Sequence, residues 1–359
     1  MTELNFLLLP IISDRLTTTS PSPSFSSHSS SSSSLLSFTN QRRRQQQQRH
    51  KPVSIRMEQY SRSKNRKDKV VVILGATGAG KSRLSVDLAT RFPSEIINSD
   101  KIQVYDGLEI TTNQITLPER RGVPHHLLGQ INPDDGELTA AEFRSVASNV
   151  VSEITSREKL PIIAGGSNSF VHALLAERFD PKIDPFGSGS GLISRDLRYE
   201  CCIIWVDVSE IVLYDYLVKR VDEMMDSGML KELAEFYDPV KSGLNRFGIR
   251  KAIGVPEFDG YFKAYPPEKE ESEKKKWDRL RKAAYDKAVE DIKENTWTLA
   301  KRQGRKIEKL KNAGWEIKRV DATASFRAVM SSSEKWREVW EEQVLEPSVK
   351  IVKRLLVQD

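Results

Sequence analysis

Apolar residues along this chain form short, β-branched runs, which alternate with longer stretches where apolar positions recur every three or four residues. The short runs predict buried strands at 69–74, 94–100, 161–166 and 201–208. The longer stretches predict helices at 82–92, 139–157, 212–235 and 277–313. This alternation indicates an α/β fold, a mostly parallel sheet flanked by helices, with ligands at the carboxyl ends of the strands.

The chain divides into four segments by composition and by the pattern of apolar residues. Residues 1–60 form a Ser-rich, polar leader, and residues 68–210 carry the alternating strands and helices. Residues 210–325 are predicted to be a mainly helical region packed on or over the sheet, and residues 326–359 a helical tail. We therefore expect an α/β core that is extended by helices in the C-terminal half.

One segment matches the whole phosphate-binding loop (P-loop) pattern G-x-x-x-x-G-K-[ST]. It consists of Gly75, Ala76, Thr77, Gly78, Ala79, Gly80, Lys81 and Ser82. It lies between a predicted strand and a predicted helix, where backbone N–H groups and a helix N-terminus face a polyphosphate. In this motif the Lys81 ammonium neutralises phosphate oxygens and the Ser82 hydroxyl reaches Mg²⁺. The context disfavours a chance Gly-rich turn, but the motif does not say which phosphate is held.

The net charge of +6 belongs to the N-terminal segment rather than to the globular part. Residues 42–67 carry +9, residues 1–41 carry −1, and residues 68–359 carry −2. The globular part therefore lacks the basic excess of many nucleic-acid-binding proteins, although a local basic groove remains open. The two cysteines, Cys201 and Cys202, are neighbours on a predicted strand and point to opposite faces, which excludes a disulfide framework and a four-ligand Cys/His zinc site.

Residues 1–60 have the composition of an organelle transit peptide, since they are rich in Ser, carry Arg and are poor in acidic residues. The apolar piece at 6–12 is interrupted by Pro10 and is too short to span a bilayer, and no later segment is apolar enough to do so. We expect import into a plastid, with the mitochondrion as the second choice. The alternative is a disordered cytosolic tail.

Two aspartates end predicted strands and are candidates for chemistry. Asp100 follows the strand after the P-loop helix and is expected beside any bound phosphate. A carboxylate there could hold Mg²⁺ through water or act as a general base, and a helix N-cap is an equally good interpretation. Asp207 ends four apolar residues in the manner of a Walker B strand, but a plain strand-terminal carboxylate is the simpler interpretation.

Histidines and basic residues supply further candidates. The adjacent His125 and His126 suit a substrate-lining or structural role better than metal binding, because neighbours cannot easily share one metal and no third ligand is near in sequence. A second group of residues could clamp phosphates or simply face solvent, namely Arg250, Lys251, Lys301 and Arg302.

Taken together, these segments resemble the isopentenyltransferase family, which includes tRNA dimethylallyltransferases and the plant adenylate dimethylallyltransferases that make cytokinins. The resemblance runs through most of 68–325 and is strongest for the adenylate branch. It rests on GATGAGKS (75–82), INSDKIQVYDGLEITTNQ (97–114), GVPHHLLG (122–129), IIAGGSNSFVHALL (162–175), RVDEMMDSGML (220–230), RFGIRKAIGVPEF (246–258) and AKRQ (300–303).

The resemblance implies a P-loop α/β core and a helical region, 210–325, which completes a substrate channel. It implies that the P-loop, with Thr77, Gly80, Lys81 and Ser82, holds the diphosphate of dimethylallyl diphosphate together with Mg²⁺. It also implies that Asp100 is the general base for the adenine N6 amino group. By the same resemblance Arg250 and Lys251 lie near phosphates.

The implied reaction transfers the dimethylallyl group to N6 of ATP or ADP, with AMP as a third candidate, and releases diphosphate as the first step of cytokinin synthesis. Transfer to tRNA is one alternative. Eukaryotic tRNA members usually carry a C-terminal zinc finger, which this chain cannot form because it has no Cys after Cys202 and no His after His172. A small-molecule kinase, which would use Asp207 for Mg²⁺, is a second alternative, and a P-loop switch or nucleic-acid-binding module is a third. The sequence gives no oligomeric state.

Overall fold

The computed structural model describes residues 67–187, 193–243, 246–267 and 278–357, and the predicted leader at 1–60 lies outside these ranges. Within them the strands form one six-stranded sheet in the order β3-β2-β4-β1-β5-β6, with every neighbouring pair parallel. The strands are β1 (Lys69–Leu74), β2 (Ser94–Asn98), β3 (His125–His126), β4 (Leu160–Ala164), β5 (Glu200–Asp207) and β6 (Ile317–Asp321). The fold class predicted from the sequence is confirmed.

Helices separate the strands as far as β5, except between β2 and β3, and then dominate. They are α1 (Lys81–Ala89), α2 (Ala140–Ser156), α3 (Asn168–Leu175), α4 (Glu210–Asp226), α5 (Met229–Phe236), α6 (Val255–Ala264), α7 (Arg279–Asn312), α8 (Thr323–Met330), α9 (Trp336–Trp340) and α10 (Glu346–Val357). Short helical turns are η1 (Pro133–Asp135), η2 (Gly248–Lys251) and η3 (Glu341–Leu345). In the described residues, no helix is long and apolar enough to cross a membrane.

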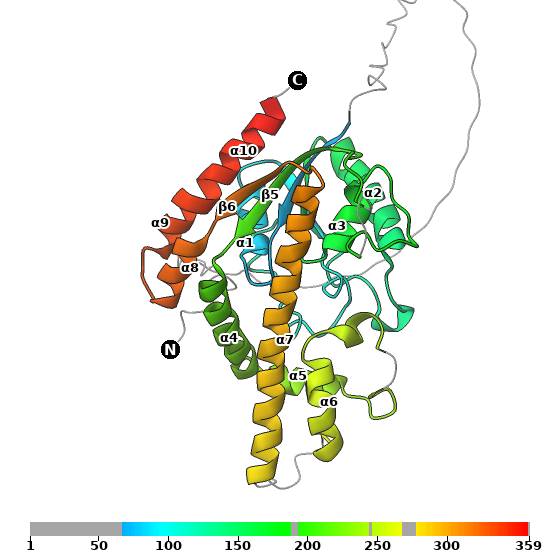
Figure 1. Ribbon diagram of the computed structural model, residues 1–359, viewed down its shortest axis with the longest axis vertical. Helices are drawn as coiled ribbons and strands as arrows, with labels where there is room; N and C mark the ends of the chain where they lie inside the picture. The colour runs from blue at the N-terminus through cyan, green and yellow to red at the C-terminus, as the bar shows by residue number, and fades with distance from the viewer. Residues whose placement is uncertain (1–66, 188–192, 244–245, 268–277, 358–359) are drawn as a thin grey trace, which may run out of the picture. The chain divides into compact units, whose positions relative to one another are not determined.

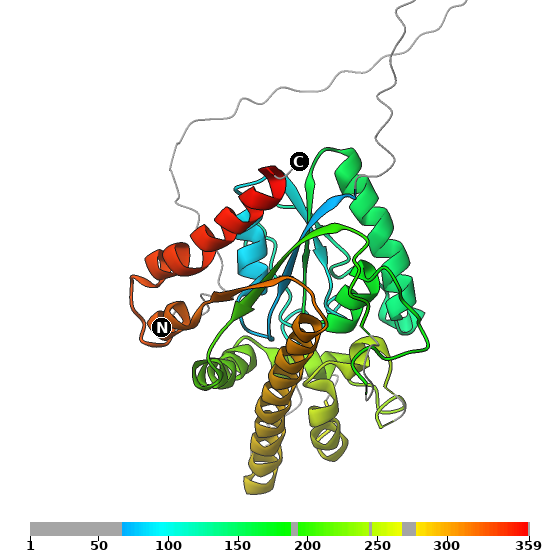
Figure 2. The same cartoon turned by 45° about the horizontal axis from the view of Figure 1, so that its top comes forward.

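Helices cover both faces of the sheet (Figure 1, Figure 2). On one face α2 and α3 contribute Phe143 and Phe170, whose rings stack at a centroid distance of 4.2 Å. On the other face α1 and α10 contribute Leu84 and Val352 to a second apolar core. Because both faces are buried, the central strands are almost continuously apolar rather than alternating, which explains their clear signal in the sequence.

Residues on β5 alternate between the two cores as a strand requires. Cys201 packs against the core under α2 and α3, whereas Cys202 is buried in the core under α1 and α10. Both thiols are free, and burial is the main cause that raises the pKa of each to about 12. The prediction of opposite faces is confirmed, and both thiols are poor nucleophiles.

Two strands escaped the sequence prediction. The two-residue β3 is too short for any periodicity, and β6 is only partly apolar because it lies at the sheet edge. As a result, the segment 210–325, predicted to be mainly helical, returns to the sheet at its end.

The prediction of a single helix at 212–235 is wrong, because the chain forms α4 and α5 with a break between them. The break lies at Gly228, whose φ of 104° is left-handed and ends the regular helix. The turn keeps α5 beside the loop 108–114, where the Glu232 carboxylate accepts the backbone N–H of Ile110 and of Thr111 at 2.8 and 2.7 Å. Glu232 therefore fixes a loop that lines the cavity described below.

The long helix α7 connects the helical region to the sheet. It begins at the side-chain cap of Asp278, which accepts the N–H of Arg281 at 2.7 Å, and packs along α6 and α4. Its C-terminal half passes the P-loop and α3 before the chain enters β6 (Figure 1). One helix thus contributes side chains to both the helical region and the carboxyl end of the sheet.

Candidate active site

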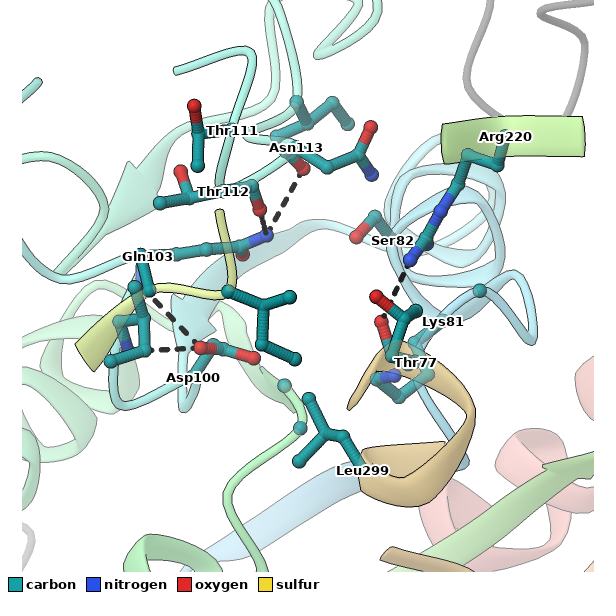
Figure 3. Close-up of a pocket in the computed structure, with 18 of the residues that line it drawn as sticks. Thr77, Lys81, Ser82, Asp100, Gln103, Thr111, Thr112, Asn113, Arg220 and Leu299 are labelled. Carbon is teal, nitrogen blue, oxygen red and sulfur yellow. Dashed lines mark hydrogen bonds between the residues drawn. The ribbon is translucent and has the colours of Figure 1, made fainter. Parts of the chain in front are cut away.

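A cavity of about 430 Å³ opens at the carboxyl ends of β1, β2 and β4. Its walls come from the P-loop, the end of β2, the loop 111–115, helix α4, the turn after η2 and the helix α7. Figure 3 shows Thr77, Lys81, Ser82 and Arg220 on one side of the cavity and Asp100 on the other. The sheet has brought together residues that lie far apart in the sequence, at the edge where α/β folds bind ligands.

The P-loop has the conformation that its glycines predict. Gly80 caps α1 with a φ of 90°, a left-handed conformation that leaves the first N–H groups of α1 free to face a ligand. The Lys81 ammonium donates to the carbonyl oxygen of Ala76 at 2.7 Å, so its side chain folds back over the loop. Thr77, Gly78, Gly80, Lys81 and Ser82 line the cavity.

Two cations stand at the P-loop, the half-buried Lys81 and the buried Arg220. Burial lowers the pKa of Lys81 to about 8; the Asp100 carboxylate opposes this shift, and Arg220 adds to it. Burial also lowers the pKa of Arg220, which is only 6% exposed and donates from Nη2 to the Thr77 hydroxyl at 3.3 Å. Among the described residues neither side chain forms an ion pair with a carboxylate, and Nε of Arg220 has no hydrogen-bond partner. A buried cation such as Arg220, with a second cation beside it, favours an anionic ligand.

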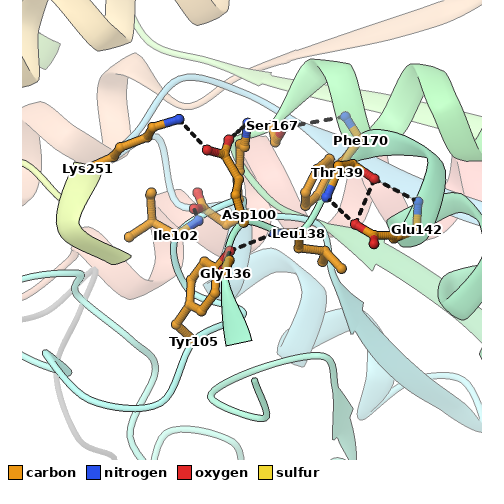
Figure 4. Close-up of polar contacts among 12 residues, drawn as sticks. Asp100, Ile102, Tyr105, Gly136, Leu138, Thr139, Glu142, Ser167, Phe170 and Lys251 are labelled. Atoms are coloured by element: carbon orange, nitrogen blue, oxygen red, sulfur yellow. Dashed lines mark hydrogen bonds and ion pairs between the residues drawn. The ribbon is translucent and has the colours of Figure 1, made fainter. Parts of the chain in front are cut away.

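Asp100 caps the backbone, but at a turn rather than at the N-terminus of a helix. Its Oδ1 accepts the N–H of Ile102 at 2.9 Å and that of Gln103 at 3.4 Å, which caps the turn after β2 (Figure 4). Its main-chain N–H donates to Oδ1 of Asn98 at 3.1 Å, which fixes the start of the turn. No described group donates a hydrogen bond to Oδ2, and Asp100 lines the cavity. One oxygen therefore holds the backbone while the other can act on a ligand.

The Gly165–Gly166 turn after β4 makes room for Asp100. A Cβ at Gly165 would lie 2.4 Å from the main-chain nitrogen of Asp100, and one at Gly166 would lie 2.7 Å from its Oδ2. Any larger residue would displace either the end of β2 or the carboxylate itself. The two glycines are therefore required by the close approach of β4 to the candidate base.

A pair of lysines stands at the rim of the cavity rather than in its depth. Lys101 and Lys251 each lie 2.5 Å from a different oxygen of the Glu137 carboxylate (Figure 4 shows the Lys251 pair). Burial would raise the pKa of Glu137, but the two lysines outweigh this and lower it. Lys251 and Arg302 line the cavity. Burial is the main cause that lowers the pKa of Lys306; Asp184 opposes this shift, and the nearby charges of Arg302 and Lys101 add to it.

Several residues singled out in the sequence lie away from the cavity or have structural partners. Arg250 is not among the lining residues, and its guanidinium lies 4.7 Å from the ring centroid of Phe236. Asp207 pairs with Arg319 of β6 at 2.7 Å, so this carboxylate neutralises the charge of a side chain on the neighbouring strand. The ammonium of Lys301 lies 5.2 Å from the ring centroid of Trp297.

The two adjacent histidines have different surroundings. His126 lies 2.7 Å from Glu95, a carboxylate that also binds Arg157 and Lys159. His125 lines the cavity, and its Nδ1 lies 2.8 Å from the carbonyl oxygen of Val123. Burial lowers the pKa of His125 to about 4, so the ring is neutral near pH 7. In the described part of the chain, no three His, Cys, Asp or Glu side chains form a group that could hold a metal.

Sequence reasoning missed Arg220 as a site residue. It lies on α4 one residue before Val221 and three after Leu217, and so on the apolar stripe of that helix. A cation on the buried face of an amphipathic helix is the signal that could have identified it. Gln303, of the segment AKRQ, was also assigned no role, although it accepts the N–H of Thr77 in the P-loop.

Comparison with known proteins places the chain in a family. The model of the family described as IPP transferase matches residues 103–188 and 187–308. Adenylate isopentenyltransferase 1, chloroplastic, of Arabidopsis thaliana is 81% identical over 365 aligned residues, which cover 100% of each chain. Adenylate isopentenyltransferase 8, chloroplastic, of the same plant is 62% identical over 82% of this chain and 87% of the relative. The chain belongs to the IPP transferase family.

Solved structures agree on the fold. The structure of a eukaryotic dimethylallyltransferase acting on tRNA superimposes with a TM-score of 0.62 and covers 80% of this chain and 79% of its own. The two sequences are 22% identical, so the likeness concerns the fold alone. The family resemblance stated from the sequence motifs is confirmed.

Proposed function

We propose that this enzyme transfers the dimethylallyl group of dimethylallyl diphosphate to the N6 amino group of an adenine nucleotide and releases diphosphate. Carbon–oxygen cleavage at an allylic diphosphate needs a site that stabilises the leaving anion, and the weak adenine amine needs a base. A single observation carries the proposal: one cavity has the P-loop on one wall, with two cations that form no ion pair among the described residues, and the carboxylate of Asp100 on the other wall (Figure 3).

The geometry supports a direct displacement between two bound substrates. The diphosphate would bind the P-loop amides, Lys81 and Arg220, which stabilise the charge that develops on the leaving group. The N6 amine would lie against Asp100, attack the allylic carbon and pass its proton to the carboxylate as the nitrogen–carbon bond forms and the carbon–oxygen bond breaks. Thr77 contributes its hydroxyl, which Arg220 already orients at 3.3 Å.

The P-loop offers few protein ligands, which suits a Mg²⁺ ion that binds together with the substrate phosphates. Mg²⁺ retains several waters and commonly takes its remaining ligands from substrate phosphates and one or two protein oxygens. The Ser82 hydroxyl, in the first turn of α1 and on the cavity wall, is a suitable protein oxygen. Bound there, Mg²⁺ would add further neutralisation of the departing diphosphate.

The basic rim suggests where the phosphates of the acceptor lie. Lys251 and Arg302 line the cavity, and Lys101 pairs with the same carboxylate as Lys251. The charges of Lys101 and Arg302 also act on Lys306. A nucleotide whose N6 contacts Asp100 could extend its phosphates to this rim, which supports ATP or ADP over AMP because they bring more charge. The prediction for Arg250 stays a prediction, since its side chain lies over Phe236.

A P-loop kinase would arrange these parts differently. It needs a carboxylate for Mg²⁺ beside the nucleotide phosphates, and the sequence candidate for that task was Asp207. Its pairing with Arg319 supports a structural role instead.

The assay that tests the proposal is incubation with dimethylallyl diphosphate, Mg²⁺ and, in parallel, ATP, ADP, AMP or tRNA. The expected product is an adenine nucleotide about 68 daltons heavier by mass spectrometry, one C₅H₈ unit, formed fastest from ATP or ADP. Modification of tRNA alone would contradict the proposed acceptor. Phosphate transfer from ATP to a small molecule without any prenylated product would contradict the reaction itself.

Plastid import is part of the proposal. The leader composition supports it, and the names of both Arabidopsis relatives include the word chloroplastic. A fluorescent reporter fused after residues 1–60 should enter plastids in plant cells. Fluorescence confined to mitochondria or cytosol would contradict this assignment and leave the enzymology unchanged.

A further inference from the structure

Gln303 lies on α7, where that helix passes between the P-loop and the Gly165–Gly166 turn. Its side chain is 6% exposed, and both ends of its amide bond to main-chain groups. Oε1 accepts the N–H of Thr77 at 2.6 Å, and Nε2 donates to the carbonyl oxygen of Gly166 at 2.9 Å. One planar amide therefore joins the phosphate cradle to the turn that lies behind Asp100.

The same amide lies close to the candidate base through Gly166. A Cβ at this glycine would meet Nε2 of Gln303 at 2.5 Å and Oδ2 of Asp100 at 2.7 Å. The amide and the carboxylate are thus packed against one glycine, with no space for a side chain between them. Contacts through Thr77, Gln303 and Gly166 therefore connect the P-loop to Asp100.

We infer that Gln303 is a positioning residue, which sets the distance and angle between the bound diphosphate and the N6 amine held by Asp100. This inference rests on the proposed function. Displacement at the allylic carbon needs both substrates aligned, and a misplacement near 1 Å can cost about 10²-fold in rate. Because Gln303 aligns the two half-sites rather than holding either substrate, its loss should lower kcat and leave the two KM values almost unchanged.

The variant that isolates this role is Gln303→Met, which keeps the unbranched length and removes both hydrogen bonds. We expect kcat to fall about 10- to 100-fold, with the KM of each substrate within about threefold of wild type. Asn168→Ala is the matched control. Asn168 donates to the main-chain oxygen of Gln303 at 3.2 Å, so its loss weakens the same part of α7 without touching the bridging amide. That control should lower Tm and leave kcat near wild type.

A double-mutant cycle with Asp100→Asn separates this inference from the proposed function. If Gln303 acts through alignment with Asp100, Gln303→Met should cost less than about threefold in the Asp100→Asn background. Equal losses in both backgrounds would overturn the inference, as would wild-type kcat in Gln303→Met while Asp100→Asn is impaired. Full activity in Asp100→Asn would instead remove the proposed base.

A second variant keeps the test valid if Gln303→Met does not fold. Gln303→Asn retains the amide but is one methylene shorter, so it can reach Thr77 or Gly166 but not both. We expect it to fold and to show the same loss in kcat. Wild-type kcat in a folded Gln303→Asn would contradict the bridging role.

Discussion

The cations deep in the cavity and those at its rim differ in whether a carboxylate pairs with them. In the depth, Lys81 and Arg220 have no carboxylate partner among the described residues. At the rim, Lys101 and Lys251 share the Glu137 carboxylate. A buried cation without a counter-ion is destabilising unless a ligand neutralises it, whereas an exposed pair contributes little either way. This difference supports the proposal that the deep cations bind an anionic substrate and that the rim contacts the acceptor.

The largest effect should come from Asp100, the deep carboxylate. Asp100→Asn keeps the Oδ1 cap on Ile102 and Gln103, because Asn and Asp cap about equally well. It removes the charge and basicity that the N6 amine needs, so kcat should fall by about 10² to 10⁴ with donor binding retained. Glu137→Gln at the rim is the control, with an expected change in kcat below about threefold. Steady-state kinetics of the two variants checks the prediction, and near-wild-type turnover in Asp100→Asn would leave this residue only as a cap.

The sequence located the P-loop and Asp100 because both depend on local pattern. The P-loop is contiguous, and Asp100 follows β2, a strand that pairs with β4, which in turn pairs with β1, so both lie at the carboxyl edge of one parallel sheet. Arg220 and Gln303 could not be placed in this way. Each reaches the P-loop from a helix more than 140 residues later, and only the packing of α4 and α7 brings it there. The edge strand β6 was missed because partial exposure weakens its apolar pattern.

A comparison of Arg220→Met with Lys251→Met tests the contrast between depth and rim directly. Loss of a charged contact to the leaving group should reduce kcat/KM for dimethylallyl diphosphate by about 10² in Arg220→Met. Lys251→Met should change the donor parameters by less than about fivefold and act mainly on the KM of the nucleotide. Initial rates at varied donor and acceptor concentrations distinguish the two. If both variants lowered kcat/KM for dimethylallyl diphosphate equally, the contrast between depth and rim would be contradicted.

The pH dependence of donor capture should report Lys81. Its pKa of about 8 means that the ammonium of the free enzyme loses its proton as the pH rises through that value, and kcat/KM for the donor should fall above about pH 8. Arg220 is one cause of the low pKa, so Arg220→Met should move this falling limb to higher pH. A limb that stays in place in Arg220→Met would mean that another group titrates there.

The smallest expected effect is on the pH dependence of stability, and it comes from the buried His172, which lies outside the cavity lining. His172 is 2% exposed, neither ring nitrogen has a hydrogen-bond partner in the part of the chain that the structure describes, and burial lowers its pKa to about 4. The unfolded chain therefore takes up a proton below about pH 6.5 that the folded chain refuses, so stability falls as the pH drops from 6.5 towards 4. His172→Phe should flatten the fall in Tm between about pH 7 and 5 without altering kcat at pH 7. An unchanged slope of Tm against pH would contradict this assignment.

The central claim is that the P-loop holds the diphosphate of the prenyl donor rather than the phosphates of the nucleotide. The most direct test is to measure the KM of dimethylallyl diphosphate and of ATP in Lys81→Ala beside the wild type, with circular dichroism to verify folding. The account predicts that the donor KM rises at least about tenfold, that kcat falls, and that the ATP KM stays within about threefold. An unchanged donor KM together with a lost affinity for ATP would contradict it.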